Sequence, residues 1–341
     1  MRRWARGFGL LLIPLTMLAV MILPGTTSAS SAPASFPRTG DRADPRAPAE
    51  GPAPILQSVS LEALLSAITP LSTRSGDSLA ATEQRATGLD APQIVSVYGF
   101  PGICTMGELG CHEAAAAVAR ARTLAAAYDR ANGARGVLPA VHLIVAVAQP
   151  HPGEDGTYLA WMPEETIREW VELARRERVL LFLDVQIGWS DPLRDARRLE
   201  WALEEPFVHL ALDPEFATRG RGLPPGDAIG TLDAPAVNAV QGYLAQLVRA
   251  GSLPSKMLVL HQFKPTMLTN KALYVDYAET RRIIDMDGFG SPEAKLSGYD
   301  AYARVGAEHA ALKLFFHWDA PVLTPEVLQA LPQPPDYVIY Q

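Results

Sequence analysis

Short apolar runs recur along the chain between Gln93 and Gln341, and most of them end in a polar residue. The segments between these runs mostly have the composition and spacing of helices. Eight strands that alternate with helices over about 250 residues are typical of a single-domain (β/α)8 barrel, or TIM barrel. The sequence therefore predicts this α/β fold, with its eight strands at residues 94–98, 141–147, 179–184, 208–213, 257–261, 282–285, 312–317 and 337–341.

Helix boundaries are marked by local signals between the predicted strands. Residues 112–132 are rich in Ala and end at Asn132-Gly133, a common helix stop. Helices are also predicted over 163–176 and 233–251, and after Ser291-Pro-Glu and Thr324-Pro-Glu, where a capping hydroxyl precedes Pro and an acid. Residues 266–280 are expected to form a long loop with one short helix.

An amphipathic segment at residues 56–68 precedes the first strand, with apolar side chains at helical spacing. No helix can follow the last strand, so we expect this N-terminal helix to cover the outside of the barrel in its place. A doubly wound open sheet is the main alternative fold. It is disfavoured because no glycine-rich phosphate loop follows the first strand.

The N-terminus has the pattern of a secretory signal peptide. Arg2, Arg3 and Arg6 precede an apolar run at residues 7–23, and small residues follow up to Ala29. A retained membrane anchor is the alternative, because the run approaches the length that spans a bilayer. Residues 1–29 are therefore predicted to be a signal peptide and 30–54, rich in Pro, Ala and Ser, a disordered linker; the barrel domain covers 55–341.

Charge and cysteine content narrow the environment and the partners. The formal net charge is −7, and no basic stripe is visible, so neither nucleic acid nor an anionic membrane surface is an expected partner. The chain has only two cysteines, Cys104 and Cys111. In an exported protein these are expected to form a disulfide in the loop after the first strand. The alternative is that both cysteines are free thiols. The sequence does not predict the oligomeric state.

Polar side chains gather at the carboxyl ends of the predicted strands, which is where TIM barrels place their catalytic groups. Alternation along each strand decides which of these side chains point into the barrel. The inward set comprises Asp184, Gln186, Asp213, Glu215, His261, Asp285, Asp287, Lys313, His317 and Asp319. His142 and His209 lie early in their predicted strands and are expected to be core residues far from the mouth.

Several carboxyl groups in one cleft cannot all ionise cheaply, so some of their pKa values should rise. A protonated carboxyl beside an ionised one is the pair that hydrolyses a glycosidic bond. Glu215 is the predicted general acid, and Asp213 orients it or stabilises charge. Asp285 and Asp287 are the candidates for nucleophile or base.

The segment Asp213-Pro-Glu215 resembles the position from which many barrel glycoside hydrolases present their acid carboxylate. The resemblance lies at the level of the superfamily, and it implies a secreted hydrolase that cleaves a carbohydrate or a cell-envelope glycan. Aromatic side chains near the strand ends would stack on sugar rings. The implied substrate-binding residues are Asp184, Gln186, His261, His317, Asp319, Tyr98, Trp189 and Trp318.

Two other classes of function compete with this hypothesis. A metal-dependent barrel hydrolase, such as a phosphodiesterase or deacetylase, could hold a divalent ion through Asp184, Asp213, Glu215, His261 and Asp285. A non-catalytic barrel that binds the cell envelope is the third possibility, since fold alone does not fix function. Because hydrolysis by two carboxylates requires no metal, we expect neither a metal nor a cofactor.

Overall fold

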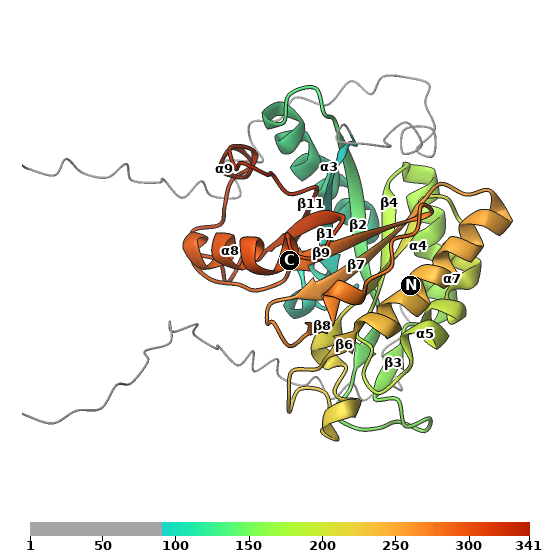
Figure 1. Cartoon of the computed structure of the whole chain (residues 1–341). Coiled ribbons are helices and arrows are strands. Elements are labelled where there is room, and N and C mark those ends of the chain that lie inside the picture. The colour runs from blue at the N-terminus through green and yellow to red at the C-terminus, as the bar shows by residue number, and fades with distance from the viewer. Residues whose placement is uncertain (1–90) are drawn as a thin grey trace, which may run out of the picture. The chain divides into compact units, whose positions relative to one another are not determined.

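The computed structural model describes residues 91–341, and these form a closed barrel of eight parallel strands with helices around it (Figure 1). The order around the barrel is β1-β11-β10-β9-β7-β5-β4-β2, and β2 pairs with β1 to close it. This confirms the predicted TIM barrel and all eight strands. Their bounds are β1 (Gln93–Gly99), β2 (Val137–Ala148), β4 (Leu180–Val185), β5 (Val208–Leu212), β7 (Lys256–Gln262), β9 (Thr280–Met286), β10 (His309–Leu314) and β11 (Tyr337–Tyr340).

The helices predicted between the strands are present, and their capping residues make the expected hydrogen bonds. Asp233, Ser291 and Thr324 each precede a Pro and accept a hydrogen bond from a backbone N–H three residues later. These caps begin α7, α8 and α9. The helices are α3 (Ala114–Ala131), α4 (Glu164–Glu177), α5 (Pro192–Arg198), α6 (Glu200–Leu203), α7 (Ala234–Gly251), α8 (Pro292–Gly298) and α9 (Pro325–Gln329). The sequence patterns had not indicated α5 and α6.

The loops contain short strands and short helical turns. The strand β3 (Leu159–Trp161) adds antiparallel to β2, and β6 (Leu232–Asp233) pairs with β8 (Leu268–Thr269). The loop at 266–280 holds one short helix, as predicted. The 3-10 turns are η1 (Cys104–Met106), η2 (Glu108–Cys111), η3 (Pro214–Phe216), η4 (Arg219–Arg221) and η5 (Lys271–Leu273), and η6 (Tyr299–Ala303) is a π-helix. The predicted signal peptide, linker and N-terminal helix lie outside the described residues.

Alternation sorts the strand residues into an outward and an inward set. Leu210 and Leu212 of β5 are fully buried and point away from the barrel axis, where the helices cover them. The inward layer around the barrel centre is aromatic, since Phe182 and Tyr337 stack with ring centroids 4.8 Å apart. The polar strand ends therefore lie on a packed hydrophobic base, which restricts how far their side chains can move.

Cys104 and Cys111 form a disulfide, as predicted. The bridge joins η1 to η2 in the loop that follows β1, on the face where the strands end. A disulfide is compatible with an extracellular protein, because such bonds persist in oxidising compartments. Within residues 91–341, no helix combines the length and apolarity that crossing a bilayer requires.

Replacing both cysteines by Ser should lower the free energy of unfolding by about 2–3 kcal/mol, because the bridge closes a short loop and restricts the unfolded chain. Urea unfolding of the oxidised protein and of the Cys104→Ser/Cys111→Ser variant measures this difference. Equal midpoints for the two proteins would contradict the expectation.

Candidate active site

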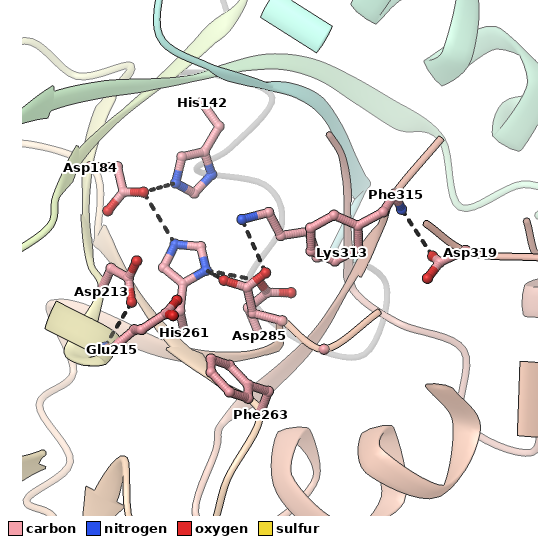
Figure 2. A network of polar contacts seen from close by, with 12 residues as sticks. His142, Asp184, Asp213, Glu215, His261, Phe263, Asp285, Lys313, Phe315 and Asp319 are labelled. Atoms are coloured by element: carbon pink, nitrogen blue, oxygen red, sulfur yellow. Dashed lines mark hydrogen bonds and ion pairs between the residues drawn. The ribbon is translucent and has the colours of Figure 1, made fainter. Parts of the chain in front are cut away.

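Seven of the eight barrel strands bring a dense group of ionisable side chains together in or just after the strands (Figure 2). Most of them are buried, and ion pairs join His142, Asp184, His261, Asp285, Asp287 and Lys313 directly. We call this group the mouth cluster. Its members are Tyr98, His142, Asp184, Asp213, Glu215, His261, Asp285, Asp287 and Lys313.

His261, at the end of β7, is the centre of the mouth cluster and is fully buried. Its Nδ1 lies 2.9 Å from Asp285 Oδ2 and 3.2 Å from Asp287 Oδ2, and its Nε2 lies 3.4 Å from Asp184 Oδ2. Burial alone would lower the pKa of His261, but Asp184, Asp285 and Asp287 together hold it well above the usual value. Carboxylates therefore contact both ring nitrogens of His261.

Lys313, on β10, supplies a positive charge to the mouth cluster. Its Nζ lies 3.0 Å from Asp287 Oδ1 and 3.5 Å from the centre of the Tyr98 ring. Burial disfavours ionisation of Asp287, yet Lys313 and His261 lower the pKa of Asp287 to about 2. Lys313 thus pairs with a carboxylate, and Asp287 is ionised at neutral pH.

Asp213 and Glu215 follow β5 on the turn η3 and have a different environment. The Glu215 N–H donates to Asp213 Oδ1 at 2.9 Å, which fixes the turn, and Pro214 between them is buried. Burial and neighbouring carboxylates raise the pKa of Asp213 to about 7 and that of Glu215 to about 8. Among the residues described, no Lys, Arg or His nitrogen forms an ion pair with Glu215. The Glu215 side chain, half-buried, extends into the cluster and carries a proton at neutral pH (Figure 2).

His142 also belongs to the mouth cluster, although its place in the sequence predicted a core residue far from the mouth. The residue is buried, as expected, but it does not lie far from the mouth, because its Nε2 is 3.7 Å from Asp184 Oδ2. The reason is the length of β2, which begins at Val137 rather than at Val141 and places His142 in register with Tyr98. His209 is a core residue as expected, where its ring packs against Phe182.

Asp285 and Asp184 lie deeper than the other carboxylates, and both are fully buried. Asp285 contacts His261 and has a raised pKa because of its burial, whereas cationic neighbours lower the pKa of Asp184. Asp285 is therefore positioned to hold the His261 ring. Of the two predicted candidates for nucleophile or base, Asp287 is the one nearer to solvent.

Five predicted substrate-binding residues lie around the mouth cluster without contacting it. Gln186 Oε1 accepts from the Ala148 N–H, which ties β4 to β2. Asp319 accepts from the backbone N–H groups of Gly290 and Phe315 and pairs with buried Lys295 at 3.2 Å. These two side chains hold loops together. The remaining three, Trp189, His317 and Trp318, lie on the surrounding loops, with His317 exposed and Trp318 39% exposed.

The aromatic residues form two separate groups on these loops. Trp189 packs against Tyr158, with ring centroids 4.7 Å apart, and its Nε1 donates to Thr218 on the loop after Glu215. Trp318 packs against Phe289 and Phe315 near the ends of β9 and β10. Partly exposed rings on two separate loops could stack on an extended ligand that has both apolar faces and polar groups, such as a chain of sugars.

Glu215→Gln should stabilise the protein at pH 8 and leave its stability unchanged at pH 4. The folded state raises the pKa of Glu215 from 4.5 to about 8, so this group reduces the stability of the fold progressively between pH 4.5 and pH 8 and has no effect below pH 4.5. A Gln side chain cannot ionise and avoids that loss. Melting temperatures of both proteins at the two pH values test this. Glu154→Gln, on an exposed loop, is the control and should match the wild type.

Comparison with known proteins identifies no relatives of this chain, since no protein-family model, no curated protein and no solved structure matches it. The site must therefore be interpreted from its own geometry.

Proposed function

We propose that this protein is a glycoside hydrolase-like enzyme that acts outside the cytoplasm on a carbohydrate or a cell-envelope glycan. The observation that carries the proposal is the pairing of two unlike carboxyl groups at the mouth of one barrel. Glu215 has no cationic partner within the described part of the chain, whereas Asp287 forms an ion pair with Lys313. Environments that separate two carboxyl groups in this way are those that assign acid and base roles.

Glu215 is the proton donor in this proposal. Its half-buried position allows contact with a bound substrate, and the turn capped by Asp213 holds its backbone in place. A neutral carboxyl group can protonate the oxygen of a leaving sugar as the bond breaks. The raised pKa keeps that proton available at neutral pH.

Asp287 is the second carboxylate, acting as nucleophile or as the base that activates water. Its ion pair with Lys313 and its contact with His261 keep it ionised and hold its two oxygens in fixed directions. Asp285 supports His261 from below. The aromatic groups around Trp189 and Trp318 would supply the sugar-stacking surfaces.

The proposed location is the cell surface or the surrounding medium. The predicted signal peptide supports it, and the disulfide between Cys104 and Cys111 suits an oxidising compartment.

A screen of polysaccharides and cell-wall preparations tests the function. The wild type is expected to release soluble fragments or new reducing ends from at least one glycan, and Glu215→Gln is expected to release far fewer. Glu154→Gln is the matched control because it makes the same change on an exposed loop. Equal cleavage by Glu215→Gln would remove Glu215 from its role, and no cleavage of any glycan would favour the envelope-binding alternative.

A further inference from the structure

We propose that His142, Asp184 and His261 form a binding site for one divalent transition-metal ion at the base of the mouth cluster. The three side chains come from β2, β4 and β7 and are completely buried. Their candidate ligand atoms all lie within 4.8 Å of one another. This proposal does not rest on the proposed function, and it goes against the sequence-based expectation that no metal is held.

The spacing of the three atoms fits a metal better than it fits hydrogen bonds. Asp184 Oδ2 lies 3.4 Å from His261 Nε2 and 3.7 Å from His142 Nε2. A tetrahedral ion with bonds of about 2.0–2.1 Å places neighbouring ligand atoms about 3.3 Å apart. Both separations are therefore close to the distance between two ligand atoms in a tetrahedral site. Only small side-chain movements are needed to bring the three atoms to bonding distance of one ion.

Within residues 91–341 these same atoms mainly face one another, and the Tyr98 hydroxyl also faces Asp184. His142 Nε2, His261 Nε2 and both carboxylate oxygens of Asp184 are buried and make no hydrogen bond there. A buried polar atom without a partner destabilises the folded state. Three of these atoms, His142 Nε2, His261 Nε2 and Asp184 Oδ2, lie close together, and one cation between them would satisfy all three at once.

The outer nitrogen of each histidine is held as in known metal sites. His261 Nδ1 donates to Asp285 Oδ2 at 2.9 Å, and His142 Nδ1 lies 3.0 Å from the Tyr337 hydroxyl, which itself donates to Ser96. Tyr337 therefore accepts from His142. With both Nδ1 atoms donating, a metal can bind at both Nε2 atoms, and the cation would displace the proton that His261 Nε2 otherwise shares with Asp184.

Two imidazoles and one carboxylate select the class of ion. This set suits Zn²⁺, Fe²⁺, Co²⁺ or Mn²⁺, whereas Mg²⁺ and Ca²⁺ prefer oxygen ligands. Three protein ligands leave at least one coordination position for water or a substrate oxygen.

A second trio, His261, Asp285 and Asp287, is a weaker candidate for the same ion. Binding there would require His261 Nδ1 to leave Asp285, and Asp287 to leave Lys313. His142 distinguishes the two sites, because it is a ligand only in the first.

Co²⁺ titration of the chelator-treated full chain tests the proposal. We expect one equivalent of Co²⁺ to bind the wild type and give the visible absorption of a low-coordinate ion, and Zn²⁺ to displace it and raise the melting temperature. Asp184→Asn and His142→Gln should each weaken binding by at least about 100-fold, and the outer-shell variant Asp285→Asn by about 10–100-fold. His151→Ala, on an exposed loop, is the matched control and should bind as the wild type does.

Failure of the wild type to bind Co²⁺ or Zn²⁺ stoichiometrically would overturn the proposal without touching the role of Glu215. Unchanged binding by His142→Gln would also overturn it and would move the ion to the second trio. If Asp184→Asn does not fold, the wild-type titration and the His142→Gln and Asp285→Asn variants still decide, since none of these readouts depends on enzymatic activity.

Discussion

The Glu215→Gln variant is expected to lose a factor of about 10²–10⁴ in rate on a natural glycan, the range that a positioned general acid contributes. The loss should nearly vanish on an aryl glycoside whose phenol leaves without protonation, because the missing proton is then no longer needed. The reason lies in the site, where Glu215 is neutral at neutral pH and reaches the cluster from a fixed turn. Steady-state rates on the two substrates measure the difference.

Asp287→Asn provides the matched comparison, since it also replaces a carboxylate by its amide. Asp287 would act on the sugar carbon or on water, so its loss should slow both substrates alike. Equal losses for Glu215→Gln on the natural glycan and on the aryl glycoside would show that Glu215 does not serve as the proton donor.

Lys313→Met is expected to be the most destabilising single change in the mouth cluster. It leaves Asp287 as a buried carboxylate with His261 as its remaining partner, and breaking a buried ion pair from one side typically costs about 3–5 kcal/mol. The Lys313 side chain is 3% exposed and that of Asp287 9% exposed, so water cannot replace the lost partner. Urea unfolding measures the change in the free energy of unfolding.

The double variant Lys313→Met/Asp287→Asn separates charge from packing. It removes both charges and should recover a large part of the stability that Lys313→Met loses, because no unpaired charge remains. If the double variant is less stable than Lys313→Met by the full cost of Asp287→Asn, the two side chains are not coupled and the expected cause of the loss is wrong.

The strand pattern predicted the fold well because each barrel strand is buried on both sides and appears as an apolar run. Alternation also predicted the inward residues wherever the strand continues, as it does at Asp184, His261 and Asp285. Beyond the strand ends it held for Asp213, Glu215 and Asp287 but failed at His317. β10 ends at Leu314 and a turn follows, so His317 is exposed although period two places it inside.

The position of His142 in the barrel was predicted wrongly because of Pro139. A proline lacks the N–H that a strand ladder uses, so the apolar run appeared to begin at Val141. In the structure β2 begins at Val137, with Pro139 paired to Val95, and His142 moves to the middle of the strand. The ion pair of Lys295 with Asp319 has no local signature at all, since it joins α8 to the loop after β10 through the fold alone.

The dependence of kcat/KM on pH tests the central claim most directly. Four charged or titratable groups act on Glu215: Asp213 and Asp287 raise its pKa, and Lys313 and His261 oppose them. If Glu215 donates the proton, kcat/KM on a natural glycan must fall about tenfold per pH unit above pH 8, as this carboxyl loses its proton. A rate that instead rises through neutral pH to a plateau, as with a metal-bound hydroxide, would contradict the account.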